Sequence, residues 1–264
     1  MTLEKLYSII RDFWPMLLRG AGATLLISTI GTLVGFVIGL LVGVVRTIPI
    51  PEKGDKRVFK RVLLKTVNAI LSVYIEVFRG TPMIVQAMVI FYGTAMAFGI
   101  QMDRMFAGLF IVSINTGAYM SEIVRGGIIS VDKGQYEAAQ AIGMNHIQTM
   151  TCVVLPQAVR NILPATGNEF VINIKDTSVL NVISVTELYF QTSTVAGISY
   201  NTFGAFFVTS FIYLAMTFSV TRILRLIEKK LEGPVNYDVI MYANQMQVLP
   251  PEEMAARKKR NKSR

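Results

Sequence analysis

The chain has 264 residues, of which 52% are hydrophobic and 16% charged, and its mean hydropathy is +0.49. This composition is too apolar for an ordinary soluble domain and predicts a membrane protein. The net charge of +9 does not indicate nucleic-acid binding, because the basic residues lie between and after apolar runs instead of forming one basic stripe. One cysteine, Cys152, and one histidine, His146, argue against a disulfide framework, a zinc site and redox chemistry.

Five apolar runs are long enough to cross a bilayer, for which a helix needs about 20 residues. They predict an all-α, polytopic membrane protein. The fourth run differs from the others because it contains charged residues, Glu169, Lys175 and Asp176. It is assigned as a span because the sidedness of its neighbours requires a crossing there. The predicted spans are residues 20–45, 82–100, 105–125, 162–184 and 202–224.

The first predicted span carries a glycine at every fourth position, namely Gly31, Gly35, Gly39 and Gly43. In a helix these residues share one face, and a face of small residues lets another backbone approach closely. We therefore predict a helix-packing surface here and not a ligand site.

The distribution of basic residues predicts the orientation. The loop 46–65 and the end of the chain are rich in Lys and Arg, which is typical of cytoplasmic segments. The N-terminus is then outside and the C-terminus inside, in a bacterial cytoplasmic membrane. Residues 62–78 are expected to be helical, at the cytoplasmic surface or leading into the bilayer. We divide the chain into a transmembrane domain, 1–232, and a cytoplasmic tail, 233–264.

A polar segment, 131–157, is expected in the cytoplasm because its charges make a crossing costly. Asp132 is suited to cap a short helix, with Gln135 reaching back to the cap. Gly143 is suited to end that helix in a left-handed conformation. An ordinary interfacial helix would satisfy all of these local features.

Within this segment the sequence reads Glu137-Ala-Ala, three residues, Gly143, nine residues, and Val153-Val-Leu-Pro156. This spacing resembles the signature loop of permease subunits of ATP-binding-cassette (ABC) importers, with Val153 in place of the commoner isoleucine. Three further motifs resemble the polar amino-acid branch of this binding-protein-dependent transport family. They are Glu76-Val-Phe-Arg-Gly-Thr-Pro-Met-Ile-Val-Gln86, Gly117-Ala-Tyr-Met-Ser-Glu-Ile-Val-Arg-Gly-Gly127 and Lys175-Asp-Thr-Ser178.

The resemblance implies a type I ABC importer permease fold that translocates a polar amino acid. It assigns Glu137, Ala138, Ala139 and Gly143 to a coupling helix that docks on a separate cytoplasmic ATPase. The chain has no phosphate-binding loop of the G-x-x-x-x-G-K-[S/T] type, so it is not expected to be an enzyme, and ATP and Mg would be bound by the partner. The other implied partners are a second permease, identical or a sister chain, and an extracytoplasmic solute-binding protein or domain, beside membrane lipid.

The fourth predicted span supplies the substrate-binding candidates, because ionisable groups at membrane depth are functional candidates. Glu169, Asn173 and Asp176 share one helix face, and Lys175 and Ser178 lie on a neighbouring stripe. Together they offer both partners that an amino-acid zwitterion requires. A Glu/Asp–Lys network that only stabilises helix packing explains the same residues equally well. They would also suit an ion-coupled carrier or channel, which is the alternative function.

Overall fold

The computed structural model describes residues 3–51 and 58–232, and every regular element in these ranges is helical. The predicted tail, 233–264, lies outside the described residues. The chain divides into one unit that ends at Leu226 and another that starts at Ile227, and the packing below is that of the first. The helices are α1 (Leu3–Thr47), α2 (Val58–Gly80), α3 (Met83–Phe98), α4 (Arg104–Ile129), α5 (Lys133–Ala141), α6 (His146–Gln148), α7 (Leu155–Asp176), α8 (Leu188–Ser199) and α9 (Thr202–Glu232), with a π-helix over Thr149–Val154 and a 3₁₀-helix over Thr177–Ile183.

Three of the described helices are long and apolar enough to cross a membrane, and they lie in α1, α4 and α9. They contain the predicted spans 20–45, 105–125 and 202–224. The helix α1 is longer than its predicted span, because it begins at Leu3 and includes charged residues. An uncharged run marks only the part of a helix that suits the hydrocarbon, whereas the helix itself continues as long as its backbone hydrogen bonds do.

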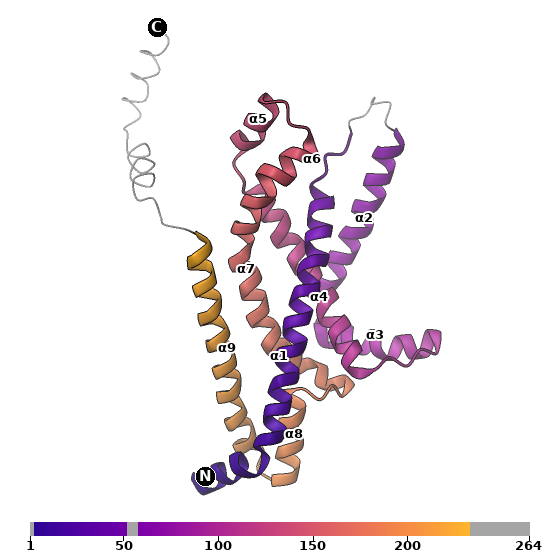
Figure 1. Ribbon diagram of the computed structural model, residues 1–264. Coiled ribbons are helices and arrows are strands. Elements are labelled where there is room, and N and C mark those ends of the chain that lie inside the picture. The colour runs from indigo at the N-terminus through magenta and orange to yellow at the C-terminus, as the bar shows by residue number, and fades with distance from the viewer. Residues whose placement is uncertain (1–2, 52–57, 233–264) are drawn as a thin grey trace, which may run out of the picture. The chain divides into compact units, whose positions relative to one another are not determined.

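The predicted span 82–100 corresponds to a helix that is too short to count as a span by itself. The helix α3 has 16 residues and is bent by 114° from α2, so the two form one candidate span or a re-entrant pair. At 1.5 Å per residue α3 extends about 24 Å, less than the hydrocarbon thickness of about 30 Å. Figure 1 shows α3 pointing away from the direction of α2.

The predicted span 162–184 also differs from the structure. The α-helix α7 ends at Asp176 and continues as a 3₁₀-helix to Ile183, where Ser184 turns the chain with φ of 60°. The polar residues of α7 keep it out of the set of helices that qualify as spans by composition. By length and composition the described chain therefore has three spans, or four if the α2–α3 pair is one.

The closest helix packing joins α1 to α4 along the glycine stripe of Gly31, Gly35, Gly39 and Gly43. A β-carbon at Gly35 would lie 2.7 Å from Cβ of Thr116, and one at Gly39 would lie 2.8 Å from the backbone carbon of Met120. The stripe meets residues of α4 that are also four apart, so the two helices stay in register over more than three turns. The facing residues are Val112, Thr116, Met120 and Val124.

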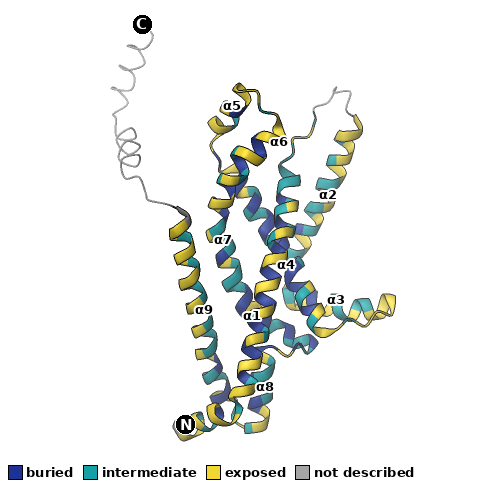
Figure 2. Ribbon diagram, viewed as in Figure 1, coloured by how far each residue is buried: buried dark blue, intermediate teal, exposed yellow. Residues whose placement is uncertain are grey.

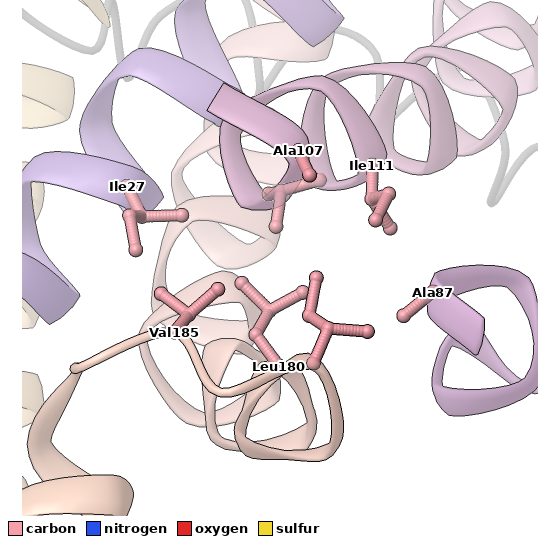
Figure 3. Packing of buried hydrophobic residues seen from close by; sticks show 8 residues of the cluster. Ile27, Ala87, Ala107, Ile111, Leu180 and Val185 are labelled. Carbon is pink, nitrogen blue, oxygen red and sulfur yellow. The ribbon is translucent and has the colours of Figure 1, made fainter. Parts of the chain in front are cut away.

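The buried hydrophobic side chains form separate clusters, and α4 contributes to two of them. One cluster joins α1, α3 and α4 to the 3₁₀-helix that follows α7, and Figure 3 shows Leu180 and Val185 facing Ile27 and Ala107 across it. A second joins the first part of α1 to α8 and α9. A third joins α4 to the start of α7 and contains Ile128, Val154 and Ile162. In Figure 2 much of α4 is buried, whereas α3 is largely exposed.

The glycine stripe yields a stability prediction. Gly39→Ala should lower the free energy of unfolding by about 1–3 kcal/mol, because the methyl group overpacks the contact with Met120 and Ser121. The matched control is Gly22→Ala in the same helix, where an added β-carbon meets nothing within 4 Å. This control should be neutral or slightly stabilising, since alanine favours a helix over glycine by up to about 1 kcal/mol. Thermal unfolding of the two purified variants in one detergent measures the difference, and equal midpoints would contradict the packing argument.

Candidate functional site

The segment 131–157 begins with a well-terminated short helix. The side chain of Asp132 accepts a hydrogen bond from the backbone N–H of Gly134 at 2.7 Å, which caps α5. At the other end Gly143 has φ of 83°, its N–H donates to the carbonyl of Gln140, and Met144 N–H donates to the carbonyl of Ala139. This pair of bonds is the Schellman arrangement, which confirms the left-handed end predicted at Gly143.

The predicted return of Gln135 to the cap of α5 is wrong. Its side-chain oxygen is 3.4 Å from Nε2 of Gln157, so the side chain reaches across to α7. The reciprocal capping box instead occurs at Asn145 and Gln148, where α6 begins. The contact of Gln135 with Gln157 is a tertiary contact, which the local sequence pattern does not indicate.

The four coupling candidates differ in exposure. Ala139 is 3% exposed and faces the body of the protein, whereas Glu137, Ala138 and Gly143 are exposed. Two large apolar residues close to the end of α5 in the sequence, Ile142 and Ile147, are also exposed, at 75% and 72%. Neither was among the residues that the sequence pattern indicated.

The base of this segment is held firmly. The hydroxyl of Tyr136 donates to the carbonyl of Ile128 at 3.2 Å, and Asn161 donates to Oγ of Ser130 at 3.0 Å. Met150 of the π-helix packs in the buried cluster that contains residues of α4 and α7. Figure 1 places α5 and α6 at the end of α7 that is farther from α8.

The predicted polar face of α7 splits into a buried and an open part. Asn173 is 4% exposed, and its Nδ2 donates to Oγ1 of Thr32 at 2.8 Å and of Thr116 at 3.0 Å. Its amide therefore bridges α1 and α4, which is the packing role. Glu169 is partly exposed and Asp176 is exposed, so these two carboxylates remain accessible.

The second stripe lies on the other side of α7. Lys175 is exposed and lines a cavity between α7 and α9, in which Arg222 and Arg225 also lie. Ser178 belongs to the 3₁₀-helix that follows α7, so the predicted α-helical stripe changes its geometry after Asp176. The motif Lys175-Asp-Thr-Ser178 thus marks the place where the helix type changes.

The motif from Glu76 to Gln86 forms the bend between α2 and α3. Nε2 of Gln86 donates to the carbonyls of Phe78 and Thr81, both at 2.9 Å, and Nδ2 of Asn115 donates to Oε1 of Gln86 at 2.8 Å. These bonds satisfy carbonyls that the end of a helix leaves unpaired. The guanidinium of Arg79 lies 5.5 Å from the ring centre of Tyr119.

Two carboxylates outside the predicted sites stabilise the fold, one in ion pairs and one as a helix cap. Glu122 pairs with Arg46 of α1 and, at 3.0 Å, with Arg125 of its own helix. Glu187 is fully buried and accepts hydrogen bonds from the backbone N–H groups of Tyr189 and Phe190, both at 2.8 Å, which caps α8. A sequence signal existed for the cap, since an acidic residue directly precedes an apolar run.

The chain matches the family of binding-protein-dependent transport system inner membrane components over residues 58–233. It is 37% identical over 219 residues to the glutamine transport system permease protein GlnP of Escherichia coli K12, a match that covers 83% of this chain and 94% of the relative. It is 30% identical over 219 residues, with the same coverage, to the arginine transport system permease protein ArtQ of Bacillus subtilis.

A solved structure has the same fold. It is a crystal structure of an amino acid ABC transporter with histidines, and it superposes with a TM-score of 0.75 at 33% sequence identity. The match covers 87% of this chain and all of the solved chain.

The position of Asn173 yields a prediction about helix packing. Asn173→Ala should lower the free energy of unfolding by about 1–3 kcal/mol, because the hydroxyls of Thr32 and Thr116 lose their buried partner. Asn168→Ala, on the exposed side of the same helix, serves as the control and should leave the midpoint unchanged. Thr116→Val should lower the free energy of unfolding less when it is added to Asn173→Ala than when it is made alone. An unchanged unfolding midpoint for Asn173→Ala would show that the bridge does not contribute to stability.

Proposed function

Because this chain belongs to the binding-protein-dependent transport system inner membrane components, as a permease subunit of an ABC importer for polar amino acids, we propose a role for each of its segments. The subunit is multi-pass and non-catalytic, and the partner ATPase of the complex binds ATP. The family assignment removes the reason to consider an ion-coupled carrier or channel.

The transmembrane part, residues 1–232, crosses the membrane five times, with the N-terminus outside and the C-terminus and tail inside. The three apolar helices and the α2–α3 pair supply four crossings, and α7 with its 3₁₀ extension supplies the fifth. Polar residues at membrane depth are acceptable where they face other helices or a water-filled path. Asn173 does the former, and the open carboxylates of α7 suit the latter.

The orientation is testable by cysteine labelling in a Cys152→Ser background. Ile198→Cys, at an exposed position in α8, should react with an impermeant thiol reagent in intact cells. Lys133→Cys, exposed in α5, should react only after the membrane is permeabilised. Reaction of Lys133→Cys in intact cells without reaction of Ile198→Cys would reverse the assigned sides.

The segment 131–157 acts as the coupling loop, and its helix α5 docks on the ATPase. The observation that carries this proposal is the combination of a rigid base with an exposed tip. Ala139 fixes α5 to the body, while Glu137, Ala138 and Gly143 stay accessible, as do Ile142 and Ile147. A force applied to such a tip moves α4 and α7 with it, because the base is bonded to both.

Substitutions in the tip test the coupling role. Gly143→Asp should cost about 1 kcal/mol in the left-handed position and, with Glu137→Lys, should lower both ATPase retention and substrate-stimulated hydrolysis. Gly143→Asn is the control for the backbone, because asparagine tolerates this conformation better than most residues. The measurement is ATPase retained per mole of detergent-extracted, monodisperse permease. Wild-type retention and hydrolysis in both Gly143→Asp and Glu137→Lys would remove α5 from the coupling surface.

The substrate path runs along the open face of α7, where Glu169 and Asp176 receive the ammonium group of the amino acid. Lys175 and Ser178 are the candidates for its carboxylate, and Asn173 contributes by holding α7 in place. A second permease, identical or a sister chain, completes the pathway, and a solute-binding protein or domain delivers the substrate from outside.

Charge-neutralising variants test the substrate path. Glu169→Gln and Asp176→Asn should each reduce uptake about tenfold or more, because a hydrogen bond to a charged group contributes about 1.5–3 kcal/mol. Lys175→Met should weaken uptake or change the order of preferred amino acids. Glu4→Gln, an exposed residue at the start of α1, is the control. The assay is uptake by assembled complexes in proteoliposomes, and unchanged kinetics in all three variants would leave these residues with packing roles alone.

A further inference from the structure

A cavity of about 370 Å³ lies between α7 and α9, and three cations are among its lining residues. Lys175 enters from α7, and Arg222 and Arg225 enter from α9. Within the described chain no ion pair joins any of the three to a carboxylate; Asp176 is the acidic neighbour of Lys175 along the chain. The remaining lining residues are Val171, Leu214, Thr217, Phe218 and Thr221.

The lining changes from apolar to basic along α9. Residues 202–221 contain no charge, and 20 helical residues extend about 30 Å, the thickness of the hydrocarbon. Arg222 therefore lies where this helix leaves the hydrocarbon, and Arg225 lies about one turn further out. Leu214 and Phe218 lie on the hydrocarbon side of the same cavity.

A cavity that is apolar at one end and basic at the other matches an amphiphile better than a free amino acid. An amino acid is polar at its backbone end and leaves the apolar half of the cavity unmatched, whereas a phospholipid has a charged head and an apolar chain. The guanidinium groups of Arg222 and Arg225 and the hydroxyls of Thr217 and Thr221, all on α9, suit a phosphate group. The guanidinium of Arg222 lies 4.8 Å from the ring centre of Phe218, which orients it at the rim.

We propose that the cavity between α7 and α9 binds an anionic phospholipid from the leaflet on the side of Arg222. Arg222 and Arg225 hold its phosphate, and an acyl chain lies along Leu214 and Phe218. Basic pockets between transmembrane helices are suited to such headgroups. The bound lipid fills the space between α7, which carries the substrate candidates, and α9. The proposal depends on the membrane placement of α9 and not on the substrate roles proposed above.

The test uses the assembled transporter, permease with ATPase, in detergent and in nanodiscs. Native mass spectrometry with added phosphatidylglycerol should show at least one tightly bound lipid per permease, and phosphatidylcholine should bind far more weakly. Arg222→Gln with Arg225→Gln should weaken phosphatidylglycerol binding about 30-fold, since each basic side chain contributes about a factor of five. Arg222→Lys with Arg225→Lys should retain most of the binding, because the charge is kept.

The control is Lys60→Gln with Lys65→Gln, which removes two exposed charges from α2 outside the cavity and should leave lipid binding intact. Equal loss in this control, or no loss in the Arg222/Arg225 double variant, overturns the proposal. Displacement of the lipid by a transported amino acid, or by inorganic phosphate alone, also overturns it and assigns the cavity to a soluble anion.

Discussion

The close contact between α1 and α4 is the constraint on which the other interactions of the transmembrane body depend. Because the glycine stripe has no side chains, the two backbones approach until β-carbons no longer fit between them. At that separation the short side chains of Thr32 and Thr116 both reach Asn173 on α7. Beyond the last glycine, Arg46 at the end of α1 meets Glu122 of α4. In a membrane, where apolar burial does not draw helices together, such close packing and interhelical hydrogen bonds provide the attraction.

The helix α7 connects the proposed functions because its sides meet different surroundings. One side is fixed through Asn173 to α1 and α4, and another leaves Glu169 and Asp176 accessible. A third faces the basic cavity shared with α9. Its first turns pack against the segment 131–157, a contact that connects the proposed coupling loop to the helix that carries the proposed substrate residues. The change to a 3₁₀-helix at Thr177 ends this rigid element.

The helix α9 is packed in two different ways along its length. Near its start it joins a buried cluster with α1 and α8, and the buried hydroxyls of Thr192 and Thr209 lie 2.7 Å apart. Further along, from Leu214 to Arg225, it borders the cavity beside α7. The lipid proposed above would therefore meet the second half of the helix, whereas the first half belongs to the buried cluster.

The sequence by itself determined the membrane class, the spans in α1, α4 and α9, the glycine face of α1 and the end of α5 at Gly143. Hydropathy, spacing and capping are local properties, and each of these features depends on a single segment. Only the tertiary structure decided the bend between α2 and α3, the partner of Gln135 and the division of the polar face of α7. Helical periodicity places Glu169, Asn173 and Asp176 on one face, but the helices that pack against that face decide which of them is buried. Those helices come from distant parts of the chain, such as Thr32, which is 141 residues from Asn173.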